Sequence, residues 1–304
     1  MIAVLFPGQG AQTPGMLAPW LEIPEVATHL TALSEATDVD VLHHGTASDA
    51  DTIRDTAIAQ PLLVAAGLAT ARAVLGDTAP GVVAGHSVGE LGAAALAGVI
   101  DDVTAMRLVT VRSAAMAAAA AASEPTSMAA VLGGVEEEVL ARLAELGLTP
   151  ANMNGGGQIV AAGAKSAIEE LVADGPTRAR VIELQVAGAF HTSYMAPAVD
   201  ALAQAAASIT PADPATALLS NADGTPVESG AEALTRIVRQ VASPVRWDQC
   251  QERMLALGVT GIIEVAPGGV LTGLAKRSLK GVPAVALKSP DDLPAARELL
   301  EQHA

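Results

Sequence analysis

The stretch GVVAGHSVGELGAAALAG, residues 81–98, decides the fold that we expect for this chain. Its first five residues are a short β-branched run that predicts a buried strand, and the residues from about Val88 predict a helix. Between them, GHSVG at 85–89 fits the pattern G-x-S-x-G on a strand-to-helix turn. Such a turn projects the hydroxyl of Ser87 at a helix N-terminus, where free N–H groups favour developing negative charge. We expect Ser87 to be a nucleophile; the alternative is a glycine-rich turn with a helix-capping serine.

Strands and helices alternate on both sides of this turn. Residues 2–6 predict a strand, 58–75 a helix, and Asp101-Asp102 the start of a long helix through an alanine run that we expect to be buried. Beyond residue 188 the pattern predicts helices at 195–207, 231–241, 247–257 and 270–279, and strands at 216–219 and 261–265. This alternation is typical of an α/β fold with helices on both faces of a mostly parallel sheet.

Residues 126–187 follow a different order. The pattern predicts, in turn, strand 128–132, helix 135–146, strands 148–154 and 158–162, helix 164–173 and strand 178–184. The order βαββαβ is that of a ferredoxin-like unit. We therefore expect a large α/β subdomain formed by residues 1–125 and 188–304, interrupted by a small ferredoxin-like subdomain, residues 126–187.

Composition narrows the classes of partner and compartment. The 304 residues include 17 Lys and Arg against 33 Asp and Glu, a net charge of −16, which disfavours nucleic acid and anionic membranes as partners. No apolar run approaches the roughly 20 residues that cross a bilayer, and the first residues lack the basic region of a signal peptide. The single Cys250 excludes an intramolecular disulfide and a cysteine-based metal cluster. We expect a soluble, cytoplasmic protein.

A serine nucleophile needs a base, and His191 is the best candidate. It follows the last strand of the inserted unit, in GAFHTS at 188–193, where the chain re-enters the large subdomain. The other histidines lie at the C-terminal end, in a polar N-terminal stretch, or beside Ser87 (His303; His29, His43, His44; His86). We expect His86 to hydrogen-bond within its turn. No acidic residue between 88 and 190 stands out as a third member of a triad, so a backbone carbonyl could orient the imidazole.

Two further segments carry weaker signals. FPGQGAQ at 6–12 follows the first strand, and its backbone N–H groups could reach a ligand and help to form an oxyanion hole beside Ser87. Arg112 shares a helix face with apolar Leu108 and Met116. A guanidinium facing an apolar surface needs an anion, which could be an internal carboxylate or the carboxylate of a substrate.

Six motifs occur in order along the chain: FPGQG at 6–10, GHSVGE at 85–90, VRSAAM at 111–116, GAFH at 188–191, SPVRW at 243–247 and EVAPGGVLTGLAKR at 264–277. Together they resemble the malonyl-CoA:acyl carrier protein transacylases of bacterial fatty acid synthesis, over essentially the whole chain. The resemblance implies an α/β-hydrolase-like large subdomain with a ferredoxin-like insertion. It also implies an acyl-carrier-protein S-malonyltransferase that works by a ping-pong mechanism, with malonyl-CoA and acyl carrier protein as partners and no metal or redox cofactor.

The resemblance also implies roles for individual residues. Ser87 matches the acylated nucleophile, His191 the base and Arg112 the clamp on the malonyl carboxylate. The backbone N–H groups of Gln9 and Val88 match the oxyanion hole, and the backbone carbonyl of Gln240 matches the group that orients the histidine. Phe190, before the histidine, accompanies malonyl selectivity in related polyketide acyltransferases, although GAFH here differs from the more usual HAFH at its first residue.

Basic residues gather in one segment of this acidic chain. Lys276, Arg277, Lys280 and Lys288 lie between residues 265 and 290, which contain no Asp or Glu. Acyl carrier proteins are acidic, so we expect Lys276, Arg277 and Lys280 to dock the carrier; the alternative is an ordinary solvated helix face. We expect a monomer.

Three other functions remain open at this point. A serine esterase or thioesterase would use the same turn with water as the acceptor, but would need an acid to complete a triad and would not need Arg112. A transacylase of a polyketide pathway would share all of the chemistry. A binding module without catalysis would not need Ser87, His191 and Arg112 together.

Overall fold

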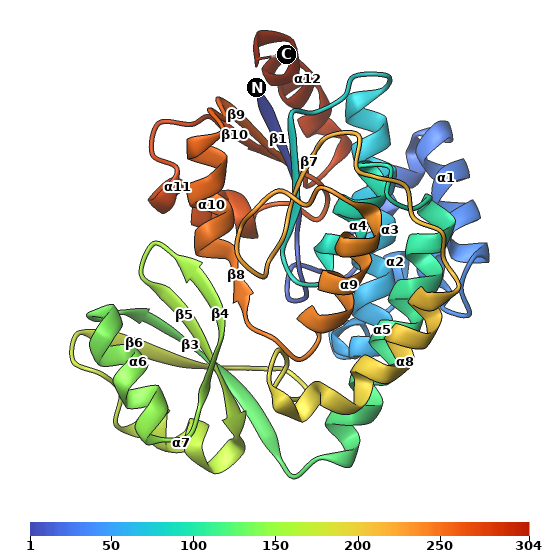
Figure 1. Cartoon of the computed structure of the whole chain (residues 1–304). Helices are drawn as coiled ribbons and strands as arrows, with labels where there is room; N and C mark the ends of the chain where they lie inside the picture. Colours follow the sequence, from blue (N-terminus) through green and yellow to red (C-terminus); the bar gives the residue numbers. More distant parts are fainter. Residues whose placement is uncertain (304) are drawn as a thin grey trace.

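Two five-stranded sheets frame the chain in the computed structural model, which describes residues 1–303 (Figure 1). The strands of the first sheet are all parallel, in the order β10-β9-β1-β2-β7. They are β1 (Ile2–Phe6), β2 (Val82–Gly85), β7 (Ala217–Leu219), β9 (Gly261–Glu264) and β10 (Ala284–Ala286). The predicted α/β class with a parallel sheet is confirmed.

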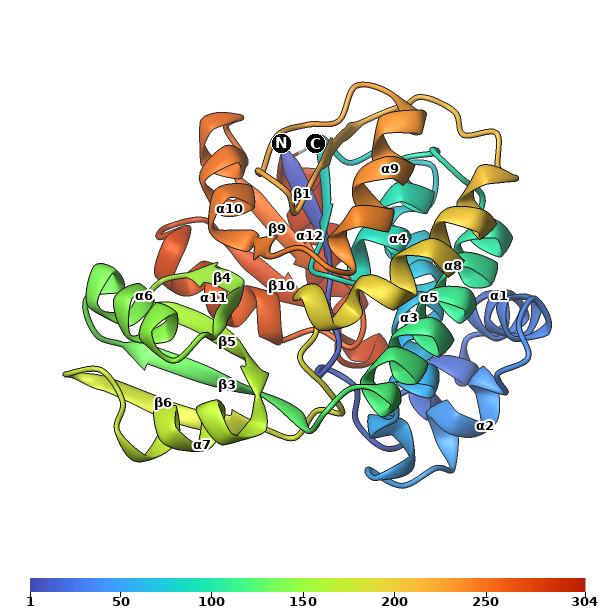
Figure 2. The same cartoon turned by 60° about the horizontal axis from the view of Figure 1, so that its bottom comes forward.

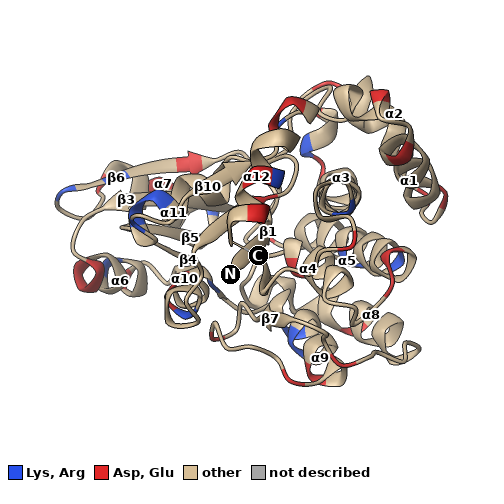
Figure 3. Ribbon diagram, turned by 90° about the horizontal axis from the view of Figure 1, so that it is seen from above, with Lys and Arg blue, Asp and Glu red and all other residues tan. Residues whose placement is uncertain are grey.

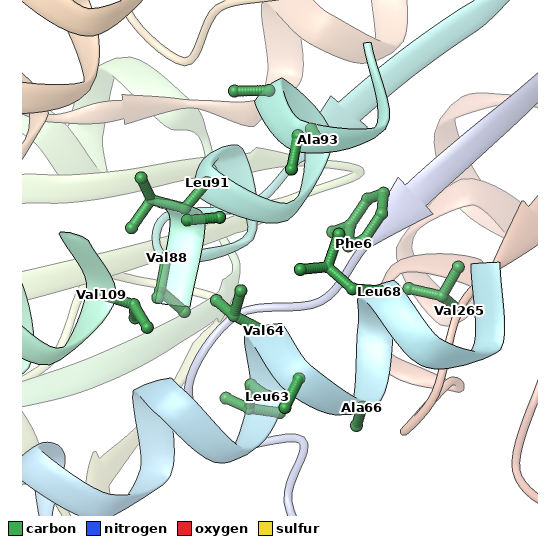
Figure 4. Close-up of a cluster of buried hydrophobic side chains, with 14 of the residues drawn as sticks. Phe6, Leu63, Val64, Ala66, Leu68, Val88, Leu91, Ala93, Val109 and Val265 are labelled. Atoms are coloured by element: carbon green, nitrogen blue, oxygen red, sulfur yellow. The ribbon is translucent and has the colours of Figure 1, made fainter. Parts of the chain in front are cut away.

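Both faces of the first sheet are buried, as the apolar sequence of β1 requires. Ile2, Val4 and Phe6 pack in one core cluster, whereas Ala3 and Leu5 belong to another on the opposite face, because successive strand residues point to opposite sides. The first face carries α3 (Thr56–Leu75), α4 (Gly89–Leu96) and α5 (Asp102–Ala122). The second carries α10 (Trp247–Ala256) and α11 (Val270–Ser278). Figure 4 shows Phe6 from β1 among side chains of the first cluster.

The remaining helices of this part lie around the same core. They are α1 (Pro24–Glu35), α2 (Val41–Thr46), α8 (Ala196–Ala207), α9 (Gly230–Gln240) and α12 (Leu293–His303). Short 3-10 turns cover Ala18–Glu22, Thr52–Arg54, Ser193–Met195 and Pro290–Asp292. Five elements were not predicted from the sequence: α1, α2, α12, β10 and the two-residue strand β8 (Val245–Arg246).

The second sheet has the order β6-β3-β5-β4-β8 and is antiparallel except for the last pair. Its elements follow one another as β3 (Thr126–Gly133), α6 (Glu136–Glu145), β4 (Thr149–Gly155), β5 (Gln158–Ala164), α7 (Lys165–Ala173) and β6 (Ala179–Leu184). This is the predicted βαββαβ order. Because β8 pairs with β4 from beyond residue 187, the second sheet also includes a strand from outside the segment 126–187.

One face of the second sheet is covered by α6 and α7, which pack on Val131 and Ile159. The residues of opposite parity, among them Met128, Asn154 and Val160, face a cavity toward the first sheet. Figure 2 shows the second sheet beside α11, with α6 and α7 on the face of the sheet that is turned away from α11. The sheet is therefore one wall of the space between the two parts.

Two helices correct the sequence analysis. α3 and α5 are long and apolar enough, by length and composition, to cross a membrane, so the expectation that no stretch approaches that length was wrong. Buried core helices pass the same test, and 83% of the α3 segment concerned is buried within the protein, against 44% for α5. The alanine run of α5 is only partly buried: Ala119 is covered, whereas Ala118, Ala121 and Ala122 are exposed.

Candidate active site

Ser87 occupies the turn between β2 and α4 in a strained conformation, with φ at 54°. A β-carbon on Gly85 would collide with the backbone of Gly89, and one on Gly89 would collide with the carbonyl of Phe6. Both glycines of the G-x-S-x-G pattern are thus required by close backbone approach. A non-glycine residue at positive φ costs about 1–3 kcal/mol and persists where the surrounding structure enforces it. The turn therefore holds the hydroxyl in a fixed direction.

His191 lies against Ser87 although 104 residues separate them (191 − 87). Its Nε2 is 2.7 Å from Ser87 Oγ, and its Nδ1 is 2.8 Å from the backbone carbonyl of Gln240. A carbonyl can only accept, so Nδ1 carries the proton and the Nε2 lone pair faces the serine hydroxyl. His191 also has a positive φ, 61°. The arrangement is a serine–histidine dyad oriented by a backbone carbonyl, the option left open by the sequence.

The imidazole of His191 is neutral at ordinary pH. Burial, together with the nearby positive charge of Arg112, lowers its pKa from 6.5 to about 3. A neutral imidazole with a free lone pair can accept the serine proton.

Arg112 projects from α5 to the same point and is 1% exposed. Its Nη1 donates to Gln60 Oε1 at 2.6 Å, its Nη2 donates to Gln240 Oε1 at 2.8 Å, and Nη2 also lies 3.4 Å from Ser87 Oγ. Among residues 1–303, no carboxylate lies within 4.0 Å of the guanidinium, so the structural salt bridge considered above is not formed. Burial lowers the pKa of Arg112 to about 10, which leaves it charged near neutral pH.

A cavity of about 320 Å³ opens beside these groups, between the two sheets. Ser87, His191 and Gln9 line it from one side, and Asn152 and Asn154 line it from the other. Phe190 also contributes to the wall. The cavity is large enough for a flexible acyl thioester arm and leads to the Ser87 hydroxyl.

The two amides expected in an oxyanion hole belong to the loop after β1 and to the N-cap of α4. Within the described residues, neither Gln9 N nor Val88 N donates a hydrogen bond. The Val88 side chain is buried in the core beside Val64 and Val109 (Figure 4), which anchors the residue that follows the nucleophile.

Comparison with known proteins gives the family of the chain. The model of the family "Acyl transferase domain" matches residues 4–292. The chain is 54% identical over 297 residues to the malonyl CoA-acyl carrier protein transacylase of Mycobacterium tuberculosis H37Rv, covering 96% of this chain and 98% of the relative. It is 36% identical to the protein of the same name from Escherichia coli K12, covering 98% and 99%.

The chain belongs to the malonyl CoA-acyl carrier protein transacylase family. The predicted family and the predicted enzyme class, an acyl-carrier-protein S-malonyltransferase, are confirmed. Solved structures agree: the crystal structure of the transacylase from M. tuberculosis has a TM-score of 0.93 at 53% identity, covering 98% of this chain and 99% of that one. A structure titled as a type II polyketide acyl-carrier protein in complex with its malonyl-transacylase has a TM-score of 0.91 at 33% identity, with coverage of 98% and 99%.

Several residues at the centre of this transacylase were not singled out from its sequence. Asn221, at the carboxyl end of β7, accepts from Ser87 N at 2.8 Å and donates to Gly85 O at 2.7 Å, so it fastens both sides of the turn. Gln60 is a buried polar residue in α3, most of whose residues are apolar. A glutamine among apolar helix residues and an asparagine just after a parallel strand are both signals that could have pointed to the site. The third missed residue is Glu90, in the first turn of α4.

His86 corrects one expectation. Its backbone carbonyl accepts from Gly89 N, but among the described residues its side chain makes no hydrogen bond within the turn; the ring Nε2 lies 2.9 Å from Asn154 Oδ1, on β4 of the second sheet. The ring also packs edge-on against Trp247. Burial lowers the pKa of His86, so the ring is held neutral. The nucleophile turn of this transacylase is therefore tied to the second sheet by the residue next to Ser87.

Three basic residues of the transacylase lie on or just after α11, a helix that lines the cavity. Lys276 and Arg277 are exposed on α11, and Lys280 is exposed just after it. The same helix lines the cavity with Val270, and Arg277 lies against Gly156 of the β4–β5 turn. Figure 3 shows basic positions near α11 and the strands of the second sheet. In the described part of the chain, no three His, Cys, Asp or Glu side chains gather to hold a metal ion.

Proposed function

We propose that the protein transfers a malonyl group from malonyl-CoA to the phosphopantetheine thiol of acyl carrier protein through a malonyl-Ser87 intermediate, and so supplies fatty acid chain extension. One observation carries the proposal. Ser87 Oγ lies 2.7 Å from a neutral imidazole nitrogen and 3.4 Å from a buried guanidinium nitrogen. The base of the nucleophile and a guanidinium that can bind the free carboxylate of an acyl group thus both lie next to Ser87 Oγ.

In the first half-reaction, His191 Nε2 accepts the proton of Ser87 as Oγ attacks the thioester carbonyl of malonyl-CoA. The backbone N–H groups of Gln9 and Val88 stabilise the oxyanion; in comparable sites the loss of one such donor slows the reaction by about 10²–10³-fold. The tetrahedral adduct expels the CoA thiolate, which takes the proton back from His191. The products are malonyl-Ser87 and CoA.

Arg112 selects the acyl group. An acyl chain bonded to Ser87 Oγ starts 3.4 Å from Nη2, so a carboxylate at its far end can receive charge-assisted hydrogen bonds from the guanidinium. Arg112 Nε has no partner among residues 1–303, which leaves the guanidinium a donor to spare. Phe190 limits the room beside the acyl group and favours malonyl over branched methylmalonyl. Fixing the acyl group in this way also disfavours attack by water.

In the second half-reaction, His191 accepts the proton of the carrier's thiol, and the thiolate attacks the malonyl-Ser87 ester. When the adduct collapses, Oγ leaves and recovers the proton from His191. No redox cofactor or metal is required by this sequence of steps. The solved relative in complex with an acyl-carrier protein supports such a partner.

The finer organisation belongs to the same proposal. We assign residues 1–125 and 188–304 to an α/β-hydrolase-like catalytic subdomain and residues 126–187 to a ferredoxin-like subdomain. The parallel order of the first sheet and the order β6-β3-β5-β4 of the second support this division. We further propose a cytoplasmic monomer that docks its carrier through Lys276, Arg277 and Lys280.

Intact-mass measurement after mixing with malonyl-CoA tests the function. We expect a stable malonyl adduct on Ser87 that disappears when carrier protein is added, with malonyl-carrier as the product. Ser87→Ala should form no adduct, and acetyl-CoA and methylmalonyl-CoA should label more slowly. Rapid release of free malonate without carrier would instead identify a hydrolase. Acyl transfer by Ser87→Ala would remove every catalytic role given above.

A further inference from the structure

Glu90 is a buried carboxyl group that the mechanism above leaves without a role. It lies in the first turn of α4, three residues after the nucleophile, and is 4% exposed. Among residues 1–303, its carboxylate hydrogen-bonds to neither His191 nor Ser87 Oγ. One carboxylate oxygen accepts from the backbone N–H of Asn221, and the other accepts from Gln240 Nε2. A carboxyl group is seldom buried unless it is paired or hydrogen-bonded for a purpose.

The partner of Glu90 joins three parts of the site. The backbone carbonyl of Gln240 orients His191, as described above. Its side-chain oxygen accepts from Arg112 Nη2 at 2.8 Å, and its side-chain nitrogen donates to the backbone carbonyl of Ser87 at 3.0 Å as well as to Glu90. The direction in which this amide points therefore affects the guanidinium directly.

An amide has a donor end and an acceptor end, and its surroundings decide which faces which. A carboxylate can only accept, so Glu90 draws the nitrogen of Gln240 toward itself and leaves the oxygen facing Arg112. The opposite orientation would set an NH₂ group against the guanidinium donors, and an oxygen against both Glu90 and the carbonyl of Ser87. Burial raises the pKa of Glu90 to about 7, although its hydrogen bonds from Asn221 and Gln240 and the charge of Arg112 favour the ionised form, so the carboxylate is the main form above that pH.

We propose that Glu90 is a positioning residue for acyl selection: it fixes the side-chain amide of Gln240, and that amide holds Arg112 Nη2 beside Ser87 Oγ. The proposal rests on the function proposed for Arg112. It predicts that Glu90 affects the choice between malonyl and acetyl groups more than the attack by Ser87 itself, because the backbone carbonyl that orients His191 does not depend on the amide.

Glu90→Gln tests this with little change of shape. It replaces one accepting oxygen by an NH₂ group, so either Asn221 N or Gln240 Nε2 loses its acceptor. We expect the ratio of the malonylation and acetylation rate constants of Ser87 to fall about tenfold, with acetylation changed much less. Asp102→Asn is the matched control, because Asp102 starts the helix of Arg112 but pairs with Arg72 and His29. It should leave the ratio unchanged.

Gln240→Met, which keeps the backbone carbonyl and removes the amide, provides an independent arm. It should lower the ratio as Glu90→Gln does, and the double variant should lose no more than either single variant, since both break one link. An unchanged ratio in Glu90→Gln, or losses that multiply in the double variant, would overturn the proposal. If Glu90→Gln does not fold, an unchanged ratio in Gln240→Met would do the same. If Arg112→Ala also leaves the ratio unchanged, the proposed role of Arg112 fails instead.

Discussion

Arg112 is a buried guanidinium held by two neutral amides instead of by a carboxylate. Neutral partners position a cation without cancelling its charge, so the guanidinium stays available to an incoming anion. Burial also excludes water, which strengthens the attraction to a carboxylate that enters the site. The arrangement is what selection of a dicarboxylic acyl group requires.

Replacement of Arg112 tests this at the level of one side chain. In Arg112→Ala, we expect malonylation of Ser87 to slow by about two orders of magnitude, because a charge-assisted pair of hydrogen bonds is lost. Acetylation should fall far less, so the malonyl preference narrows. Arg107→Ala, an exposed residue on the same helix, is the control. If the rates of malonylation and acetylation fall by the same factor, Arg112 has a structural role only.

The pKa of His191 gives a prediction for pH dependence. Because the pKa lies at about 3, the neutral base persists down to about pH 5. The acetylation rate by acetyl-CoA, which offers Arg112 no carboxylate, should therefore stay flat between about pH 8 and 5. Rapid-quench mass spectrometry over this range would check it. A fall with a midpoint near the ordinary histidine value of about 6.5 would contradict the low pKa.

Candidate site residues could be selected from the sequence where a local pattern surrounds them. The glycines around Ser87 indicated a nucleophile on a tight turn. The apolar helix face of Arg112 indicated only that the guanidinium needs an anion, and left open whether the protein or a substrate supplies it. Gln60, Asn221 and Glu90 were missed, because their roles depend on partners between 52 and 150 residues away. Hydrogen bonds of that span leave no periodic signal in one sequence.

At the scale of elements, α11 depends on a carboxylate at its N-terminus. Glu264, at the end of β9, is 0% exposed, and its oxygens accept from the backbone N–H groups of Gly269, Leu271 and Thr272 at 2.8–2.9 Å. These are donors that a helix start leaves without partners. The negative charge also suits the positive end of the helix. Glu264 thus sets the position of a helix that lines the cavity.

Glu264→Gln should therefore weaken the whole fold. One accepting oxygen becomes a donor facing other donors, and we expect the free energy of unfolding to fall by on the order of 2 kcal/mol. Urea unfolding followed by circular dichroism would measure it. Glu298→Gln, on the exposed side of α12, should change stability by about 0.5 kcal/mol or less. Equal effects of the two substitutions would show that the cap does not anchor α11.

The elements predicted best are those with strong local patterns. Helix α5 begins at Asp102 as expected, because Asp101 caps it: its side chain accepts from Thr104 N at 2.6 Å. By contrast, β8 and β10 have two and three residues, too few for a hydrophobic period to emerge. They are strands because neighbouring strands offer them hydrogen-bond partners. Such elements follow from the tertiary fold and not from their own sequence.

At the scale of the whole molecule, residues from both parts of the chain line the cavity. Ser87 follows β2 of the first sheet, Arg112 lies on α5, and His191 lies between β6 and the 3-10 turn Ser193–Met195. The second sheet supplies the facing wall with Asn152 and Asn154. The contact of His86 with Asn154 links the two. The order of elements along the chain predicted the βαββαβ unit, but the approach of the second sheet to the nucleophile depends on packing between distant segments. The sequence patterns therefore did not locate the cavity.

The charge of the whole molecule makes the place of the basic residues important. A chain with net charge −16 repels an acidic carrier at long range, so productive approach needs a local positive surface close to the cavity. Lys276, Arg277 and Lys280 lie on and after α11, which lines that cavity. Reversing all three charges to glutamate should raise the KM for carrier protein about tenfold. It should also leave malonylation by malonyl-CoA nearly unchanged.

Steady-state kinetics with each substrate varied in turn separates the outcomes. Lys165→Glu, an exposed residue on α7 at the helix-covered face of the second sheet, is the control for net charge. Because exposed charges are screened within about 8–10 Å at moderate salt, the difference between the charge-reversed and native proteins should shrink as ionic strength rises. An equal rise of KM for malonyl-CoA would assign the basic residues to the CoA phosphates. If the KM for carrier protein does not change, α11 is an ordinary solvated helix and does not dock the carrier. Exposed basic side chains look the same in both cases, so the carrier kinetics decide between them.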